Sequence, residues 1–296
     1  MGKIKRTFGF LLNHPLGKKH PVKTLLRFSV WQLQAALSSG KLVVKTFIAP
    51  VKFYARKGLT GITGNIYTGL HEFDDMAFLL HFLHPEDSFF DIGANVGSYT
   101  LLASGVCGAN SIAIEPVSST FEILSKNIAL NKLQSKVSLI NAVAGGAIST
   151  IIFTQNEDTG NHVVSADESK TDSAELPVIT IDSLLTKGTP ALIKMDVEGY
   201  ETEVLKGMNR TLSSESLKAI IIELNGSGGR YGFDENKIHD LLISNRFKPY
   251  NYDAFNRQLN LLKSYGSYNT IYCRDMDFVI DRLKNAKAFK IMGEKI

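Results

Sequence analysis

The chain has 296 residues, of which 44% are hydrophobic and 21% charged, which is ordinary usage for a globular protein. This composition excludes a disordered or collagen-like chain, and no uninterrupted apolar run approaches the ~20 residues that span a bilayer. Two distant cysteines, Cys107 and Cys273, argue against a disulfide framework or a zinc ribbon and favour a reducing compartment. No secretory signal pattern opens the chain, so we expect a cytoplasmic protein.

The net charge of +4 hides an asymmetry along the chain. Residues 1–71 contain twelve Lys or Arg and no Asp or Glu, whereas residues 72–296 carry a net charge of −8. The charge shift predicts a basic N-terminal extension or cap over residues 1–71 and a main domain over 72–296. A segment of one charge sign also indicates that the front of the chain meets something anionic.

Within this extension, Leu26, Val30, Leu33 and Leu37 recur at helical spacing, which predicts an amphipathic helix over residues 22–38. Two interpretations stay open. The helix is a cap packed on the main domain, or it lies on an anionic membrane, which requires an apolar face beside Lys and Arg. The absence of acidic residues also fits a transit peptide.

From residue 72 the pattern changes to alternating helices and short apolar strands, interrupted by a polar stretch over residues 155–175. This alternation predicts right-handed crossovers and a mainly parallel sheet with helices on both faces. The expected helices cover residues 72–83, 98–103, 119–133, 201–212 and 234–245. The expected strands cover residues 88–91, 111–115, 137–140, 150–154, 178–181, 191–195, 219–224, 248–252 and 268–273.

A strand, a glycine turn and a helix start follow one another between Asp91 and Ser98. Ligands of an open parallel sheet bind beyond the carboxyl ends of its strands. Gly93 allows close approach of the backbone to a ligand, and Gly97 allows the helix to pack close to the strand. Glu115 ends the next strand, where a carboxylate can accept two hydrogen bonds from a ribose diol.

Three cofactor classes could use this turn. NAD requires G-x-G-x-x-G, whereas the spacing here is Gly93-x-x-x-Gly97, and a phosphate-binding P-loop requires a Lys that the turn lacks. S-adenosylmethionine has no phosphate but carries an ammonium group, which suits Asp91 directly or through water. The residues therefore favour S-adenosylmethionine.

At this turn, and again at Leu192-Ile193-Lys194-Met195-Asp196-Val197-Glu198-Gly199-Tyr200-Glu201, the chain resembles the FkbM family of S-adenosylmethionine-dependent methyltransferases. The resemblance runs from about residue 86 to residue 250. It implies a Rossmann-like class I methyltransferase fold, a seven-stranded sheet in the order 3-2-1-4-5-7-6 with an antiparallel seventh strand. It also implies O-methylation of a saccharide, a glycolipid or a glycosylated metabolite.

The resemblance carries a set of cofactor residues with it. Those that match the family's motifs position by position are Asp91, Gly93, Asn95, Gly97 and Glu115. Their neighbours are expected to complete the cofactor site: Ala94, Ser98, Tyr99, Pro116, Asn141, Ala142 and Glu72. Many methyltransferases hold adenine with an acidic residue after the third strand. Here Asn141 or the backbone is expected to do so, and Glu72 to reach the cofactor's far end.

Carboxylates after the strand over residues 191–195 are the catalytic candidates. Methyl transfer to a hydroxyl requires close approach of the acceptor oxygen and removal of its proton. Asp196 and Glu198 are expected to do this. Lys194 is expected to pair with Asp196 or Glu223, and His162, in the polar stretch, to be a mobile general base. The alternative is that such carboxylates only stabilise a helix N-terminus.

A metal site is a second possibility at these strand ends. Asp196, Glu223 and Asn225 offer the hard oxygen ligands that Mg²⁺ prefers. The competing interpretation is that they are polar groups that end core strands.

Two other functions compete with methyl transfer. An NAD-dependent sugar-modifying oxidoreductase has the wrong glycine spacing. A non-catalytic nucleic-acid-binding protein could bind its ligand through the basic residues of the segment 1–71. The complete set of acidic cofactor residues argues against this interpretation. We therefore expect a saccharide or glycolipid acceptor, no nucleic acid, and peripheral contact of the N-terminus with an anionic membrane at its inner surface.

Overall fold

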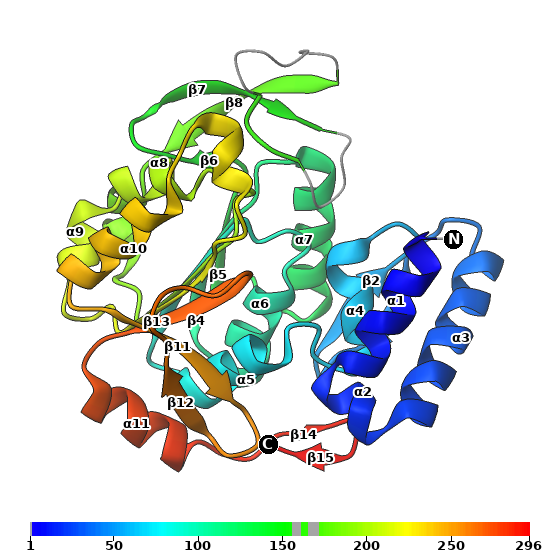
Figure 1. Cartoon of the computed structure of the whole chain (residues 1–296). Coiled ribbons are helices and arrows are strands. Elements are labelled where there is room, and N and C mark those ends of the chain that lie inside the picture. Colours follow the sequence, from blue (N-terminus) through cyan, green and yellow to red (C-terminus); the bar gives the residue numbers. More distant parts are fainter. Residues whose placement is uncertain (1, 156–160, 165–171) are drawn as a thin grey trace.

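A computed structural model describes residues 2–155, 161–164 and 172–296 of the chain. Its centre is an eight-stranded sheet in the order β12-β11-β13-β10-β9-β3-β4-β5 (Figure 1). Strands β3, β4, β5, β9 and β10 run parallel, and β13 lies antiparallel between β10 and β11. Their bounds are β3 (Ser88–Ile92), β4 (Asn110–Ile114), β5 (Val137–Ile140), β9 (Leu192–Met195), β10 (Ala219–Glu223), β11 (Lys248–Asp253), β12 (Gln258–Leu261) and β13 (Asn269–Cys273).

The order of these strands confirms the predicted order 3-2-1-4-5-7-6 with its antiparallel seventh strand. The predicted number of strands was wrong by one. The additional strand, β12, forms an antiparallel hairpin with β11 at the sheet edge. The alternation Gln258-Leu259-Asn260-Leu261 is a strand signal that the prediction did not include, although most of these side chains are exposed.

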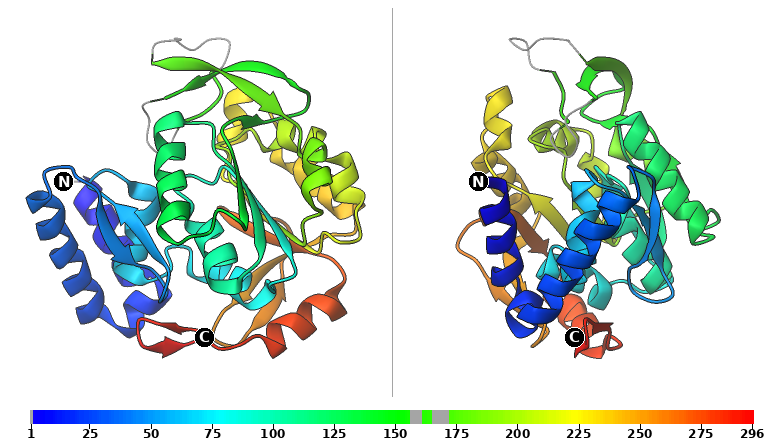
Figure 2. Two further views of the ribbon diagram at one scale, coloured as in Figure 1. Left: turned by 180° about the vertical axis from the view of Figure 1, so that it is seen from behind. Right: turned by 90° about the vertical axis from the view of Figure 1, so that its right-hand side faces the viewer.

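Helices cover both faces of the sheet because successive strand residues point to opposite sides. Phe89 and Leu192 pack with α5 (Phe73–Phe82), the π-helical segment η1 (Leu101–Cys107) and α11 (Met276–Asn285). Their neighbours Phe90 and Ile193 pack on the other side. That side carries α8 (Glu201–Lys206), α9 (Asn209–Ser213) and α10 (Glu235–Ser244) (Figure 2).

The expected single helix over residues 201–212 is in fact two helices, α8 and α9. They break at Gly207, where a Cβ atom would lie 2.1 Å from the carbonyl oxygen of Gly145. The remaining helical elements that follow strands are α6 (Ser98–Thr100), α7 (Ser118–Leu130), η3 (Ile181–Lys187) and η4 (Ser227–Tyr231).

The N-terminal segment forms a layer of helices beside the sheet, drawn in blue in Figure 1. Its elements are α1 (Gly2–Asn13), α2 (Pro15–Lys19), α3 (Pro21–Leu37), β1 (Val43–Thr46), β2 (Lys52–Ala55) and α4 (Thr60–Thr68). The helix predicted over residues 22–38 is therefore present. Trp31 and Phe53 share one apolar cluster with Leu124 of α7. The division at residue 71 stays a prediction, although residues from both sides of it build this cluster.

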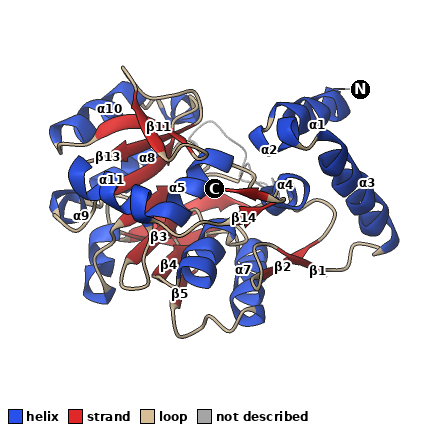
Figure 3. Ribbon diagram, turned by 90° about the horizontal axis from the view of Figure 1, so that it is seen from below, coloured by secondary structure: helices blue, strands red, loops and turns tan. Residues whose placement is uncertain are grey.

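The C-terminus returns to the N-terminal helices as a small hairpin of β14 (Lys290–Ile291) and β15 (Glu294–Lys295) (Figure 3). Glu294 accepts hydrogen bonds from Lys19 and His20, at 3.0 and 2.9 Å. These contacts attach the C-terminal hairpin to the N-terminal helices. None of the helices in the described ranges has the length and apolarity that crossing a membrane requires.

A second, three-stranded sheet in the order β6-β8-β7 lies above the strand ends in Figure 1. Its strands are β6 (Val143–Ala144), β7 (Ser149–Thr154) and β8 (Ser173–Ile179). The strand predicted over residues 178–181 was placed too late, because β8 begins inside the stretch expected to be an irregular polar segment. Residues 156–160 and 165–171 of that stretch lie outside the described residues.

Candidate functional site

A cavity of about 1440 Å³ lies at the carboxyl ends of β3, β4, β9 and β10. The parallel register of these strands brings Asp91, Glu115, Asp196 and Glu223 to one edge of the sheet. All four residues line the cavity. Residues of α1, α3 and α4 form its opposite wall.

Asp91, near the end of β3, binds the helix α6 that follows the glycine turn. Its buried Oδ2 accepts hydrogen bonds from the Thr100 backbone N–H, at 2.9 Å, and from the Thr100 hydroxyl, at 2.5 Å. Burial raises the pKa of Asp91 to about 6. Gly93, at φ +80°, is required here because a Cβ atom would lie 1.8 Å from the Asp196 carbonyl oxygen. Gly93 therefore allows the backbone of the turn to lie close to the residue that follows β9, and it also lines the cavity.

Glu115 binds the same turn from the end of β4. Its Oε2 accepts a hydrogen bond from the Asn95 N–H and its Oε1 from the Val117 N–H, both at 2.9 Å. A carboxylate has about four lone-pair positions, so two remain for a ligand. Burial raises the pKa of Glu115 to about 7.

Most of the other residues predicted for the cofactor site line the cavity, and two of them, Gly97 and Asn141, instead stabilise the turns beside it. Ala94, Asn95, Ser98, Tyr99, Pro116, Ala142 and Glu72 line the cavity. Gly97 does not line it, and a Cβ there would lie 2.5 Å from Leu124 Cδ1, so its small size serves packing against α7 rather than against the strand. The Asn141 side chain donates to the carbonyl oxygens of Glu115 and Pro116, at 2.8 and 2.9 Å. It therefore braces the turn after β4 rather than lining the cavity.

Glu72 and Tyr99 meet at the wall of the cavity. The Tyr99 hydroxyl donates to Glu72 Oε2 at 2.6 Å. The Lys194 ammonium lies 5.4 Å from the centre of the Tyr99 ring. Tyr99 thus connects the predicted cofactor turn to the charged residues that follow β9.

Three carboxylates gather where β9 and β10 end. Oxygen atoms of Asp196, Glu198 and Glu223 lie within 4.8 Å of one another. The buried Lys194 Nζ lies 3.2 Å from Asp196 Oδ2 and 3.1 Å from Asn269 Oδ1. Burial opposes its charge, but Asp196, Glu72 and Glu223 outweigh burial and raise the pKa of Lys194. Lys194 therefore remains an ammonium and neutralises part of the cluster.

Glu198 occupies a constrained position in the turn after β9. Its backbone has φ +54°, an uncommon conformation for a residue with a side chain. The buried Glu201 fixes the turn, since its Oε1 accepts hydrogen bonds from the N–H groups of Val197 and Gly199, at 3.1 and 3.3 Å. Burial and the nearby Asp196 raise the pKa of Glu198 to about 7. Burial and Asp196 also raise the pKa of Glu223.

Two predicted residues lie differently from expectation. Asn225 is not part of the carboxylate cluster: it is exposed, and its Oδ1 accepts a hydrogen bond from the Ser227 N–H at 2.9 Å. Glu198 takes the place expected for Asn225 beside Asp196 and Glu223. His162 is buried, and its backbone N–H donates to Thr154 Oγ1 at 2.9 Å.

The wall opposite the sheet contains residues that the sequence did not identify. Phe10, Phe28, Tyr67 and His71 line the cavity from this side. The His71 ring lies 4.8 Å from the Phe10 ring, and its Nδ1 rests on Gly64, where a Cβ atom would lie 2.0 Å away. This Nδ1 is buried without a hydrogen-bond partner in the described part of the chain, so Nε2 is the nitrogen left to face the cavity. Burial lowers the pKa of His71.

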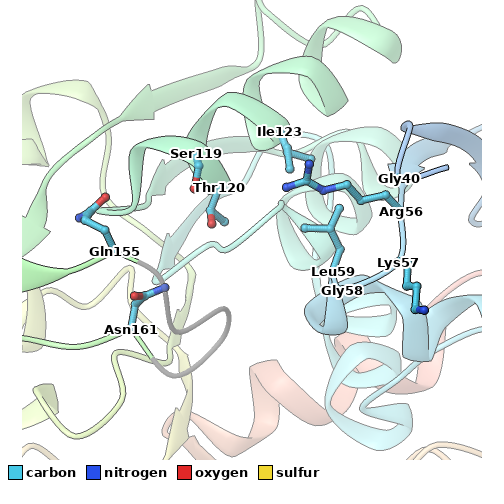
Figure 4. A pocket seen from close by; sticks show the side chains of 10 residues that line it. All are labelled: Gly40, Arg56, Lys57, Gly58, Leu59, Ser119, Thr120, Ile123, Gln155 and Asn161. Atoms are coloured by element: carbon cyan, nitrogen blue, oxygen red, sulfur yellow. The ribbon is translucent and has the colours of Figure 1, made fainter. Parts of the chain in front are cut away.

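A second pocket, of about 300 Å³, lies between α7 and the loop that precedes α4. Arg56 and Lys57 border it on one side and Ser119 and Thr120 on the other (Figure 4). In this view Arg56 extends toward α7, whereas Lys57 points away. Asn161 borders both pockets, so the smaller one adjoins the large cavity.

Comparison with known proteins adds the following findings. Residues 91–259 match the family model for the methyltransferase FkbM domain. The chain is 28% identical over 219 residues to the hexuronic acid methyltransferase AglP of Haloferax volcanii, covering 72% of this chain and 78% of that protein. Among solved structures, an S-adenosylmethionine-dependent methyltransferase from Agrobacterium tumefaciens is 11% identical, with a TM-score of 0.41, covering 79% of this chain and 70% of that chain.

Another solved structure, M. capricolum TrmK with S-adenosylhomocysteine, is 11% identical, with a TM-score of 0.38, covering 68% of this chain and 67% of that chain. At such scores the strand order of the sheet, rather than the superposition, establishes the fold. The family model spans more than half of the residues, and its motifs lie at the cavity just described. The chain belongs to the FkbM family of methyltransferases.

Proposed function

We propose that this methyltransferase transfers a methyl group from S-adenosylmethionine to a hydroxyl of a saccharide, a glycolipid or a glycosylated metabolite. The observation that carries this proposal is the carboxylate cluster of Asp196, Glu198 and Glu223 in the same cavity as the Asp91–Glu115 turn. The relative from Haloferax volcanii, a hexuronic acid methyltransferase by name, supports a sugar acceptor.

The residues of the turn fit S-adenosylmethionine by their chemistry. Glu115 has lone pairs free for the two hydroxyls of a ribose, and Asp91 offers negative charge to an ammonium group. Ala94, Asn95, Pro116 and Ala142 would line the cofactor between these ends. When bound, S-adenosylmethionine supplies an electrophilic methyl group on a positively charged sulfur.

Glu198 is the proposed general base. Its pKa of about 7 lies near the working pH, where a base is both ionised and able to accept a proton. Glu198 accepts the proton that the acceptor hydroxyl loses as its oxygen takes the methyl group. Asp196 and the Lys194 ammonium orient that hydroxyl, and the neighbouring His162 opposes the rise in the pKa of Glu198.

A Mg²⁺ ion is the alternative means of activating the hydroxyl, since Asp196, Glu198 and Glu223 are hard oxygen ligands. Lys194 already supplies a positive charge to this cluster, which favours the metal-free base. Exhaustive EDTA treatment separates the two. Full activity after chelation supports Glu198 acting alone, whereas loss that added Mg²⁺ restores supports the metal.

The wall formed by the N-terminal helices is the proposed acceptor site. Aromatic rings bind the apolar faces of sugar rings, and the neutral side chains beside them suit hydroxyls. Phe10, Phe28 and Tyr67 provide the rings, and Gln32 donates to the Tyr67 hydroxyl at 3.1 Å. With its lowered pKa, His71 is a neutral hydrogen-bonding group at neutral pH.

The proposed location is the cytoplasm, with peripheral contact at the inner membrane surface. The support is the charge of residues 1–71, which hold twelve basic and no acidic residues. Anionic lipid headgroups attract such a segment.

Titration calorimetry with S-adenosylhomocysteine, NAD and duplex DNA in parallel tests the proposed function against its competitors. We expect binding of S-adenosylhomocysteine alone. Binding of NAD would favour an oxidoreductase, and binding of DNA without S-adenosylhomocysteine would favour a nucleic-acid-binding protein. Mass spectrometry of glycans from cells lacking the protein would then identify the acceptor by the loss of one methyl group.

A further inference from the structure

The outer face of α3 is an unusual surface of this molecule. Five aliphatic residues on it are between 53% and 79% exposed: Val22, Leu26, Val30, Leu33 and Leu37. Their spacing of three and four residues places them on one side of the helix. They form a stripe about 22 Å long at 1.5 Å per residue, which we call the α3 stripe.

The helix is attached to the molecule by its other side. Thr24, Trp31 and Ala35 are its buried residues, and Arg27 Nε donates to the Ile66 carbonyl oxygen at 2.6 Å. The helix therefore packs on the molecule through the side that faces away from its exposed apolar residues. Folding does not bury the α3 stripe, and α3 lies at the outer edge of the molecule in Figures 1 and 3 and in the left view of Figure 2.

The exposed charges that flank α3 in the sequence are basic, and the one carboxylate described beside its N-terminal end, Glu294, is paired with Lys19 and His20. Exposed Lys18 precedes α3 and exposed Lys41 follows it. The first acidic residue of the chain is Glu72. An apolar helix face flanked by lysines is the composition of helices that lie in the plane of an anionic membrane.

We propose that the α3 stripe enters the interface of an anionic bilayer, with α3 parallel to the membrane plane and Lys18 and Lys41 against the headgroups. This inference deepens the membrane contact proposed above by assigning it to one surface. A second copy of the chain fits this surface less well, because pairing through α3 would bring two basic segments together.

The test measures sedimentation of the full chain with vesicles of phosphatidylcholine alone or of equal parts phosphatidylcholine and phosphatidylglycerol. We expect binding to the anionic vesicles that falls with salt. The double variant Leu26→Ser/Leu33→Ser should lower that binding about tenfold or more, since it removes apolar area that enters the interface. Lys18→Glu/Lys41→Glu should lower it as well.

Leu261→Ser is the matched control, because Leu261 is equally exposed but lies on β12. It should bind vesicles as the unaltered chain does. Equal binding by Leu26→Ser/Leu33→Ser, or equal binding to neutral vesicles, overturns the proposal. So does a wild-type dimer, seen by light scattering, that this variant converts to monomer.

All variants are also titrated with S-adenosylhomocysteine, whose affinity should not change. This measurement confirms folding and separates the two proposals. A variant that loses vesicle binding but still binds S-adenosylhomocysteine supports the role of the α3 stripe and leaves the proposed methyl transfer unaffected. A chain that binds vesicles but not S-adenosylhomocysteine would contradict the proposed methyl transfer and leave the α3 stripe standing.

Discussion

The cavity has two walls of opposite character. The wall built by the sheet and α5 presents eight carboxylates and Lys194: Glu72, Asp74, Asp75, Asp91, Glu115, Asp196, Glu198 and Glu223. The wall built by the described residues of the first 71 presents thirteen residues without an Asp, Glu, Lys or Arg among them. One wall is densely charged, and the other is aromatic and neutral.

This difference separates two tasks. Acidic groups in a partly buried cavity stabilise a cation and accept protons, which suits a sulfonium cofactor and a base. Neutral polar groups beside aromatic rings suit an uncharged sugar ring. Because the family match begins at residue 91, the cofactor wall carries the family motifs, and the acceptor wall comes largely from residues outside the match. Substitutions on the two walls should therefore affect different constants.

The largest effect is expected at the charged wall. Glu198→Gln keeps the side-chain shape but removes the proposed base, so it should lower kcat by ~10²–10⁴. Asp196→Asn removes the charge that orients the acceptor hydroxyl and should also lower kcat. Transfer of labelled methyl into a cellular carbohydrate extract measures this, and S-adenosylhomocysteine should still bind. Glu203→Gln on α8, whose carboxylate accepts from Lys206, is the control. Near-normal turnover by Asp196→Asn would show that the carboxylates are scaffolding.

A smaller loss is expected at Glu115. Glu115→Ala should weaken S-adenosylhomocysteine binding by ~1.5–3 kcal/mol, the scale for lost hydrogen bonds to a charged group. Calorimetry measures the affinity, and circular dichroism confirms the fold. Glu122→Ala on the exposed side of α7 should bind normally. An unchanged affinity in folded Glu115→Ala would remove the ribose assignment.

The smallest effect is expected at the neutral wall. His71→Phe removes one hydrogen-bonding group, worth ~0.5–1.5 kcal/mol, so the KM for the acceptor should rise by about two- to tenfold. The affinity for S-adenosylhomocysteine should stay the same. Gly64→Ala should act similarly by displacing the His71 ring. His84→Phe, at an exposed histidine, is the control. A changed cofactor affinity with an unchanged KM would reverse the roles of the two walls.

The charged wall could be predicted largely from the sequence because its residues follow directly on strands. The end of a parallel strand fixes where the next side chain goes, so Asp91, Glu115 and Asp196 meet as expected. Asn225 departs from this rule because it lies two residues beyond β10. There its side chain binds the turn at Ser227.

The neutral wall could not be predicted because long-range packing builds it. His71 faces the cavity through its contacts with Gly64 and Phe10, which no spacing in the sequence reveals. Asn269, which binds Lys194, comes from β13, far along the chain. The sequence left two interpretations of α3 open for a related reason, since an apolar period shows that a helix has two faces but not which one packs.

The most direct test of the proposed chemistry is the pH dependence of the rate at saturating S-adenosylmethionine. Saturation removes the titration of Glu115 from the measurement. Since burial raises the pKa of Glu198 to about 7, the base is protonated below that pH and ionised above it. The rate of methyl transfer should therefore rise with pH, with its midpoint at or below pH 7, because the positive sulfur of the bound cofactor favours the ionised form of Glu198. In Glu198→Gln the residual rate should lose this rise. A Glu198→Gln profile with the same shape and midpoint as the unaltered enzyme would contradict the assignment of Glu198 as the base.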